Sequence, residues 1–291
     1  MPTTRMVPSA GLEIAVREHS GPGSGRPTVV LVHGYPDRQQ TWDPVVESLP
    51  PAELHIVTYD VRGAGASGVP GQTSDYRTEL LLEDLASVLD AVLVPGEAAH
   101  LVGHDWGSVQ LWAAVVAESS HPRLRGRIAS FTSISGPSLD HSVWLARHQQ
   151  GRRRRLLRQL GRSWYVAAFH VPVLPDLIWR HLHGPLGRWV AAKQGMGPDY
   201  WGPGLGHDAE NGLRLYRANL LSRRMTKQAH TDVPVLVITP RWDVFVTDVF
   251  LDELDRMCSN LRVVEVAGGH WVTRTHPGVV ANLILEQVRD R

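Results

Sequence analysis

A carboxylate stands at the centre of the most distinctive segment of this chain. Asp105 lies two residues after Gly103 and two residues before Gly107, in the sequence Gly-His-Asp-Trp-Gly. A short apolar run (residues 101–102) precedes the segment, and a helix-like run (residues 108–117) follows it. Small residues at these positions are typical of a sharp turn from strand to helix, which lifts the central residue above the edge of the sheet. The segment therefore predicts that Asp105 is a nucleophile.

A carboxylate nucleophile implies a particular kind of substrate. Serine is the common central residue of such turns, and it attacks acyl carbonyls because the resulting ester can be hydrolysed. Attack by serine on a saturated carbon would leave an unactivated ether, whereas attack by a carboxylate leaves an alkyl ester that water can open. Asp105 therefore indicates displacement at a saturated carbon, as in an epoxide or an alkyl halide. The alternative is a chance turn in which Asp105 caps the next helix.

A base and a residue that orients it are found further along the chain. His270 follows two glycines after an apolar run at residues 261–266, and Asp243 follows the run at residues 233–239. The chain has fifteen histidines, so residue type alone does not identify the base. His270 is distinguished by its position after a predicted strand. The order nucleophile, acid, histidine is a known order of a catalytic triad. Asp243 on its own is equally typical of a turn.

Strands that alternate with helices must position these residues. The predicted strands cover residues 28–32, 55–59, 128–134, 233–239 and 261–266, and the predicted helices cover residues 76–94 and about 277–289. Residues 12–19 alternate weakly, as in a hairpin at the edge of a sheet. Polar residues follow the strands at their carboxyl ends. The pattern predicts an α/β fold with a mostly parallel sheet and the site along its carboxyl edge.

The alternation stops between residues 138 and 230. This stretch predicts short helices separated by prolines, and it is too long for a loop in a compact domain. We therefore expect a helical cap at 138–230 that covers the carboxyl edge of a core formed by residues 1–137 and 231–291. Five of the ten tryptophans fall within the cap, which suggests an aromatic-lined cavity.

The overall composition is that of an ordinary globular protein. The chain has 291 residues and a formal net charge of +1, which argues against a chain-wide nucleic-acid or membrane footprint. The only cysteine, Cys258, excludes an internal disulfide and suits a reducing compartment. The first residues lack the apolar segment of a signal peptide, and no run is long enough to span a membrane. We expect a cytoplasmic protein that is a monomer or a homodimer.

The motifs together resemble those of epoxide hydrolases of the α/β-hydrolase fold, over essentially the whole chain. The resemblance rests on five segments: His33-Gly-Tyr-Pro36, Asp60-x-Arg-Gly-x-Gly-x-Ser67, the segment around Asp105, Asp243, and Gly-His270-Trp. Residues 127–138 are also similar to the hydrolase half of actinobacterial proteins that fuse an epoxide hydrolase to a short-chain dehydrogenase. The resemblance implies an eight-stranded, mostly parallel sheet with helices on both faces and a helical cap.

The resemblance also implies roles for two tyrosines of the cap. Epoxide hydrolases use two such tyrosines to hydrogen-bond the epoxide oxygen. Tyr165 and Tyr216 stand in segments that match those of the family. A phenol with a pKa near ~10 can donate a hydrogen bond to the emerging alkoxide without being ionised at neutral pH. Core packing is the alternative role for either tyrosine alone.

Other residues take expected roles around this centre. The backbone N–H groups of Tyr35 and Trp106 are expected to form an oxyanion hole for the ester intermediate. Structural roles near the site are expected for His33, Gly34, Pro36 and Asp60. We expect the pocket to be lined by Trp164, Phe169, Trp179 and Trp271, and to accept a bulky hydrophobic or aromatic epoxide. No metal or organic cofactor is implied; the reactants are an epoxide and water.

Three rival enzyme activities share this fold. Haloalkane dehalogenases hold the halide with an asparagine in the position of Tyr35 and with the tryptophan after the nucleophile; Trp106 fits them and Tyr35 does not. Fluoroacetate dehalogenases carry a His-Trp pair where Tyr165-Val166 stands here, and an arginine in the position of Trp106. Asp105 itself excludes a serine esterase. A non-catalytic ligand-binding role is the alternative from another class, because fold alone does not give function.

The strongest charge run is Arg152–Arg155, followed by Arg158 and Arg162. We expect it to be the solvated face of a cap helix whose leucines, Leu156, Leu157 and Leu160, face inward. A patch that binds nucleic acid or a membrane surface is the alternative.

Overall fold

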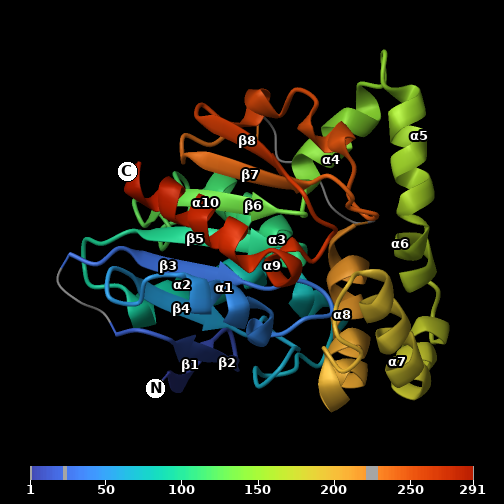
Figure 1. Ribbon diagram of the computed structural model, residues 1–291, viewed down its shortest axis with the longest axis horizontal. Helices are drawn as coiled ribbons and strands as arrows, with labels where there is room; N and C mark the ends of the chain where they lie inside the picture. Colours follow the sequence, from blue (N-terminus) through green and yellow to red (C-terminus); the bar gives the residue numbers. More distant parts are fainter. Residues whose placement is uncertain (1, 22–24, 221–228, 291) are drawn as a thin grey trace.

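Eight strands form one twisted sheet in the order β1-β2-β4-β3-β5-β6-β7-β8 (Figure 1). The strands are β1 (Thr3–Ser9), β2 (Leu12–Glu18), β3 (Thr28–Val32), β4 (His55–Tyr59), β5 (Ala99–His104), β6 (Ile128–Ile134), β7 (Val235–Pro240) and β8 (Leu261–Val266). The structure is a computed structural model, and it describes residues 2–21, 25–220 and 229–290. β1 and β2 are antiparallel, β2 runs antiparallel to β4, and the other pairs are parallel. The predicted fold class is thus confirmed, with a further edge strand, β1, that the sequence pattern did not indicate.

Helices cover both faces of the sheet and explain its sequence. The core helices are α1 (Asp43–Ser48), α2 (Thr78–Val92), α3 (Trp106–Ala117), α9 (Val272–Thr275) and α10 (Pro277–Arg289). All five residues of β3 are buried. Val30 and Val32 pack into the cluster with α2 and α3, whereas Val29 and Leu31 pack into the cluster with α10 on the opposite face. Burial on both faces is the reason for an unbroken apolar strand.

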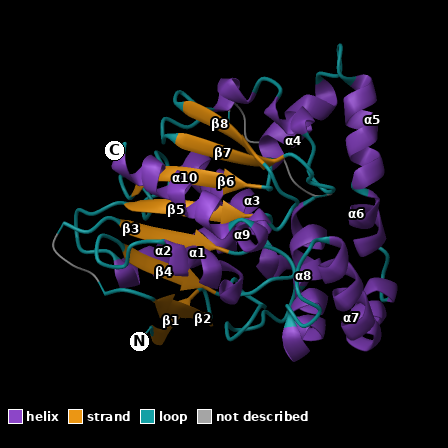
Figure 2. Cartoon of the chain, viewed as in Figure 1, coloured by secondary structure: helices purple, strands orange, loops and turns teal. Residues whose placement is uncertain are grey.

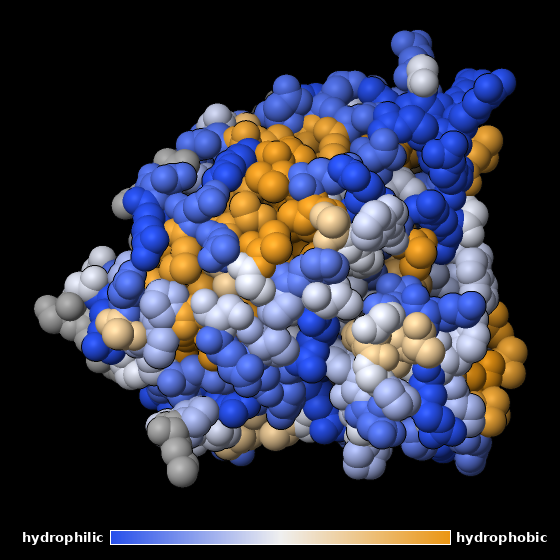
Figure 3. Space-filling model, in the orientation of Figure 1, coloured by the Kyte–Doolittle hydropathy of each residue, from blue (hydrophilic) through white to orange (hydrophobic). Residues whose placement is uncertain are grey.

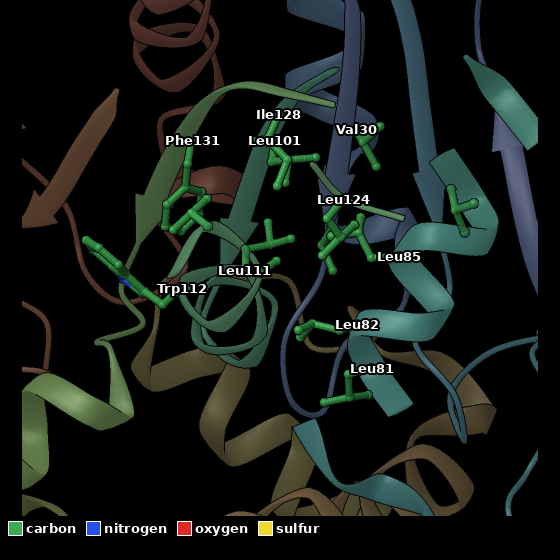
Figure 4. Packing of buried hydrophobic residues seen from close by; sticks show 14 of the residues in the cluster. Val30, Leu81, Leu82, Leu85, Leu101, Leu111, Trp112, Leu124, Ile128 and Phe131 are labelled. Carbon is green, nitrogen blue, oxygen red and sulfur yellow. The ribbon is translucent and has the colours of Figure 1, made fainter. Parts of the chain in front are cut away.

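The larger of the two clusters lies under α2 and α3 (Figure 4). Side chains of α2 meet those of β3 and β5 there, and Trp112 of α3 packs edge-on against Phe131 of β6 at a centroid distance of 5.2 Å. Burial of each such aliphatic side chain contributes about 1.5–3 kcal/mol. The packing fixes α3 against β5, and therefore fixes the turn between them that carries Asp105.

Among the described residues, five α-helices lie between β6 and β7. They are α4 (Leu139–Arg147), α5 (Arg153–Arg162), α6 (Trp164–Phe169), α7 (Leu174–Lys193) and α8 (Leu205–Asn219). Figure 2 shows α5–α8 beyond the carboxyl ends of the strands. The predicted cap, 138–230, contains these helices; its limits stay a prediction, and its residues 221–228 lie outside the described residues. Short 3₁₀ turns complete the fold at Gln39–Trp42, Thr73–Tyr76, Gly202–Gly204, Asp248–Leu251 and Leu254–Met257.

Two expectations about the helices of this segment are wrong. α7 continues through Pro185 instead of ending there, because Trp179 of α7 packs against Leu205 and Leu213 of α8 and holds the helix together. In α5, Leu157 and Leu160 face solvent and only Leu156 is partly buried. The inward face of α5 carries polar groups instead, because it lies against the polar loop after β7.

Candidate active site

Asp105 occupies the turn between β5 and α3. Its backbone has φ 50° and ψ −122°, a strained conformation for a residue with a side chain. Its N–H donates to the carbonyl of Ile134 at 3.0 Å, and its carbonyl accepts the N–H of Val109 at 2.9 Å. A Cβ added to Gly107 would lie 2.0 Å from the carbonyl oxygen of Val32. The close approach of α3 to β3 therefore requires a glycine there, as the sequence pattern predicts.

The structure brings Asp105, His270 and Asp243 together from three different strand ends. The Nε2 atom of His270 lies 3.5 Å from Oδ2 of Asp105, and its Nδ1 atom lies 3.0 Å from Oδ2 of Asp243. The other oxygen of Asp243 accepts the backbone N–H groups of Phe245 at 2.8 Å and Val246 at 3.0 Å. His270 and Asp243 are buried, whereas 16% of the Asp105 side chain is exposed. The arrangement is that of a nucleophile, a base and a residue that orients the base.

The charges of this triad are strongly coupled. Burial by itself would lower the pKa of His270, but the carboxylates of Asp243 and Asp105 outweigh it and raise this pKa to about 10. Burial opposes ionisation of Asp243, yet the positive charge and hydrogen bond of His270 hold the pKa of that carboxyl below its usual value. The surroundings of His270 therefore favour its protonated form.

The loop after β3 touches Asp105. The backbone N–H of Tyr35 donates to Oδ1 of Asp105 at 2.8 Å, and the Tyr35-Pro36 peptide bond is cis. Trp106, the other residue expected to offer a backbone N–H, is the first residue of α3. A Cβ at Gly34 would lie 2.4 Å from Cβ of Asp105. Gly34 therefore allows the loop to reach the carboxylate.

We expect Gly34→Ala to displace the Tyr35 N–H from Asp105. The new methyl group overlaps the nucleophile and the His104 carbonyl at 2.7 Å, and overpacking of this kind costs about 1–3 kcal/mol of unfolding free energy. Urea denaturation and steady-state kinetics measure the two effects. Gly71→Ala is the matched control, because nothing lies within 4 Å of its added Cβ. Equal stability and activity of the two variants would contradict this role of Gly34.

His33 and Asp60 brace the loops below the site. The Nε2 atom of His33 accepts the N–H of Val61 at 2.9 Å. Asp60 accepts the N–H groups of Gln39 at 2.8 Å and Ala66 at 3.0 Å. Both side chains are buried, so the loops after β3 and β4 are tied to each other.

The two cap tyrosines lie near Asp105. Tyr165 comes from α6 and Tyr216 from α8, and their ring centroids are 6.1 Å apart. Tyr216 also packs edge-on against Trp106 at 5.0 Å and Tyr35 at 5.3 Å. Burial, together with the negative charge of Asp105, raises the pKa of both phenols. Both hydroxyls are therefore neutral donors at neutral pH.

Of the four expected pocket residues, Phe169 contacts both cap tyrosines, and Trp179 and Trp271 contact other residues of the site. Phe169 packs against Tyr165 at 5.5 Å and Tyr216 at 5.0 Å, Trp179 lies 6.2 Å from Tyr35, and Trp271 follows His270. Trp164 does not line the site: it lies at the outer surface and is 69% exposed. The reason is that adjacent positions of a helix point in different directions, so α6 turns Tyr165 inward and Trp164 outward.

The sequence pattern did not single out Asp37, which ties the site to the cap. Its carboxylate is buried and accepts the indole N–H of Trp271 at 2.8 Å and of Trp201 at 2.6 Å, and the hydroxyl of Tyr200 at 3.1 Å. Its place one residue after Pro36 was the only available signal. The partners lie more than 160 residues away, so no local pattern could identify them.

Phe245 and His104 complete the surroundings of the base. Phe245 packs edge-on against His270 at 4.8 Å. Nε2 of His104 donates to the His270 carbonyl at 2.9 Å, and burial lowers the pKa of His104. Across the described ranges, no group of three or more histidine, cysteine, aspartate or glutamate side chains is placed to hold a metal ion. No helix of the described chain is long and apolar enough to cross a membrane.

The fold and the strand-end triad define a known class of protein. Residues 27–277 match the family model of the α/β hydrolase fold, and the chain belongs to that family.

Among its relatives is the "probable oxidoreductase EphD" of Mycobacterium tuberculosis, which is 35% identical to this chain. The alignment has 303 positions and covers 97% of this chain and 49% of the relative. The chain thus spans about half the length of this curated relative. Epoxide hydrolase A of M. tuberculosis is 35% identical over 138 residues, covering 47% of this chain and 40% of the relative. An epoxide hydrolase mutant from Bacillus megaterium has a similar structure, with a TM-score of 0.80, 21% identity and coverage of 98% and 100% of the two chains.

Proposed function

We propose that this protein hydrolyses an epoxide to a vicinal diol through a covalent ester on Asp105. The observation that carries the proposal is the carboxylate at the nucleophile position, with His270 and Asp243 behind it and two phenols beside it. The names of the relatives support it. A bulky hydrophobic or aromatic epoxide suits the aromatic surroundings of the site.

The first step opens the ring. Oδ1 of Asp105 is held by the Tyr35 N–H, so Oδ2 attacks the epoxide carbon and the carbon–oxygen bond of the ring breaks. Tyr165 and Tyr216 hydrogen-bond the departing oxygen, and one of them transfers its proton to it. The resulting phenolate regains a proton from water. Preorganised donors aimed at developing charge are worth about 3–4 kcal/mol of barrier.

The second step hydrolyses the ester. Esterification removes the charge of Asp105, which is one of the two charges that raise the pKa of His270. The pKa of His270 falls, so the imidazole becomes available as a base once its proton is lost to solvent. It takes a proton from water as the water oxygen attacks Cγ of Asp105. The Tyr35 and Trp106 N–H groups stabilise the oxyanion. The bond between Cγ and Oδ2 then breaks as the departing oxygen takes a proton from the His270 imidazolium, and the diol is released.

We expect Asp105→Asn to lower the pKa of His270. Asparagine imitates the uncharged ester, and it removes both the charge and the charged hydrogen-bond acceptor that favour the imidazolium. NMR titration of the His270 ring nitrogens in the wild type and the variant measures the change. The wild-type ring is expected to stay protonated to about pH 10, whereas the variant ring loses its proton at lower pH. An unchanged titration would contradict the proposed switch from acid to base.

We expect Tyr165→Phe and Tyr216→Phe each to slow ring opening by about 10²-fold, and the double variant to slow it further. The affected quantity is the rate of ester formation in a single turnover, because the phenols act before the ester exists. Tyr59→Phe is the matched control, since the Tyr59 hydroxyl is buried without a hydrogen-bond partner among the described residues. Variants that lose only ester hydrolysis would argue against the assigned step.

Diol formation from an aryl epoxide, with Asp105→Ala as the blank, tests the function. We expect catalytic turnover by the wild type and none by the blank. Turnover of haloalkanes without diol formation would favour the dehalogenase alternative, to which Trp106 is suited. Ligand binding without turnover of either substrate class would mean a non-catalytic role.

A further inference from the structure

The outer face of α5–α7 exposes an unusual amount of apolar surface. Leu157 and Leu160 of α5 and Trp164 of α6 are 66%, 67% and 69% exposed. The spacing of three residues puts Leu157 and Leu160 on one side of α5, and Trp164 begins α6, which follows α5 after a single residue. The surface continues over the start of α7, where Val173 and Leu174 are also exposed. Figure 3 shows apolar side chains at the outer edge of the molecule beside α5–α7, on the side away from the sheet.

The arginines of α5 divide into two groups. Arg152 and Arg155 form ion pairs with carboxylates of the loop after β7, including Asp252. Arg153, Arg154 and Arg158 are exposed, and within the described part of the chain none of them has an ion-pair partner. The unpaired guanidinium groups therefore flank the exposed leucines, while the paired ones attach the helix to the core.

Charge is also distributed unevenly over the chain. Residues 138–200, which contain α4–α7, hold ten arginines and lysines but only three aspartates and no glutamate, a net charge of +7. The whole chain has a net charge of +1, so the remaining residues have −6. Arg152, Arg155 and Arg180 are paired with carboxylates outside this segment. The remaining excess of positive charge favours an anionic partner. The small total charge conceals this asymmetry.

We propose that the outer face of α5–α7 docks on an anionic lipid surface. Helices that lie in a membrane interface combine leucine and tryptophan on one side with arginine beside them, which is the arrangement of Leu157, Leu160 and Trp164 with the unpaired arginines. The leucines enter the boundary of the acyl chains, and the guanidinium groups meet the lipid phosphates. α6 carries Trp164 on this face and Tyr165 on the site face, so one helix separates the docked surface from the candidate active site.

Two other partners fit this face less well. A symmetric dimer through it would place each patch against itself, which would bring Arg153, Arg154 and Arg158 of both copies into one interface. Nucleic acid would pair with the arginines but would leave the leucines without an apolar partner. A lipid surface satisfies both kinds of side chain.

Co-sedimentation with extruded vesicles tests the proposal. The full chain is mixed with vesicles of phosphatidylglycerol and phosphatidylcholine in equal amounts, or of phosphatidylcholine alone, at about 0.1 M salt. We expect binding to the anionic vesicles only. Arg153→Gln/Arg154→Gln/Arg158→Gln should weaken it by about 100-fold, and Leu157→Ser/Leu160→Ser by at least about 10-fold. Val94→Ser/Val279→Ser is the matched control, since both valines are exposed elsewhere.

A fluorescent probe on the proposed docking face distinguishes contact of this face with lipid from electrostatic attraction of the whole protein to the vesicle. Cys258 is buried, so Leu160→Cys can be labelled selectively with a polarity-sensitive fluorophore. We expect a blue shift on addition of anionic vesicles, and none for the same label on Val94→Cys. Equal binding by the charge variant and the wild type, no shift at position 160, a dimer formed through this face, or tighter binding to an oligonucleotide than to the vesicles would each overturn the proposal.

Discussion

Asp105→Asn will lose diol formation by about 10⁴-fold relative to the wild type, the size of effect expected when one member of a catalytic triad is removed. Asparagine keeps the shape of the side chain and can still accept the Tyr35 N–H, which now donates to Oδ1 of Asp105 at 2.8 Å. It cannot displace an epoxide oxygen, because its amide is a poor nucleophile. The loss is therefore chemical and leaves the fold of the turn in place.

Steady-state kinetics and circular dichroism separate these two effects. Asp105→Asn should give the circular dichroism spectrum of the wild type, because asparagine has the same shape and can still accept the Tyr35 N–H. Asp290→Asn, an exposed substitution, is the matched control and should retain full activity. Asp105→Ala is a second variant, because the asparagine of Asp105→Asn can deamidate slowly to aspartate and restore activity, whereas alanine cannot. Retention of more than about a tenth of the turnover by Asp105→Ala would refute the nucleophile assignment.

His270→Gln will form the ester and fail to hydrolyse it. Ring opening needs the carboxylate of Asp105 and the phenols, whereas hydrolysis needs a base within reach of the ester, and general-base catalysis contributes about 10²–10⁴-fold. Glutamine can still accept and donate hydrogen bonds in the place of an imidazole whose Nδ1 lies 3.0 Å from Asp243. Each molecule of the variant should therefore open one epoxide, keep it as an ester on Asp105, and then stop.

Mass spectrometry of the intact variant after mixing with an aryl epoxide measures this adduct. The expected gain is the mass of one substrate, located on the peptide that contains Asp105. His181→Gln, an exposed position on α7, is the control and should show turnover without an accumulated adduct. If His270→Gln turns over slowly without any adduct, water attacks the epoxide directly and His270 acts in another way.

Local patterns predicted the sheet because its central strands are buried, and buried strands consist mainly of apolar residues. β3 is apolar at every position since helices cover both of its faces, and Asp105 stands at a turn whose close contacts demand glycine. The antiparallel β1 was not predicted because it is an exposed edge strand. Val7 and Ser9 are its only buried residues. An exposed strand carries no periodic apolar signal.

The cap was harder to predict because its helices face the site, the core and solvent within a few residues. Leu157 and Leu160 are residues typical of a buried face, but both are exposed to solvent. Gln159, which lies between them in the sequence, is buried and donates to the carbonyl of Phe245 at 2.7 Å. Asp37 was missed because its partners lie far away in the chain. Contacts between residues so far apart in the sequence depend on tertiary packing, which the spacing of nearby residues does not reveal.

A single turnover of excess enzyme with an aryl epoxide in ¹⁸O-water tests the central claim most directly. If Asp105 forms the ester, water attacks Cγ and its oxygen stays in the carboxylate, so the Asp105 peptide carries ¹⁸O and the first diol does not. Diol that carries ¹⁸O, together with an unlabelled Asp105 peptide, would mean direct attack by water and would contradict the covalent mechanism.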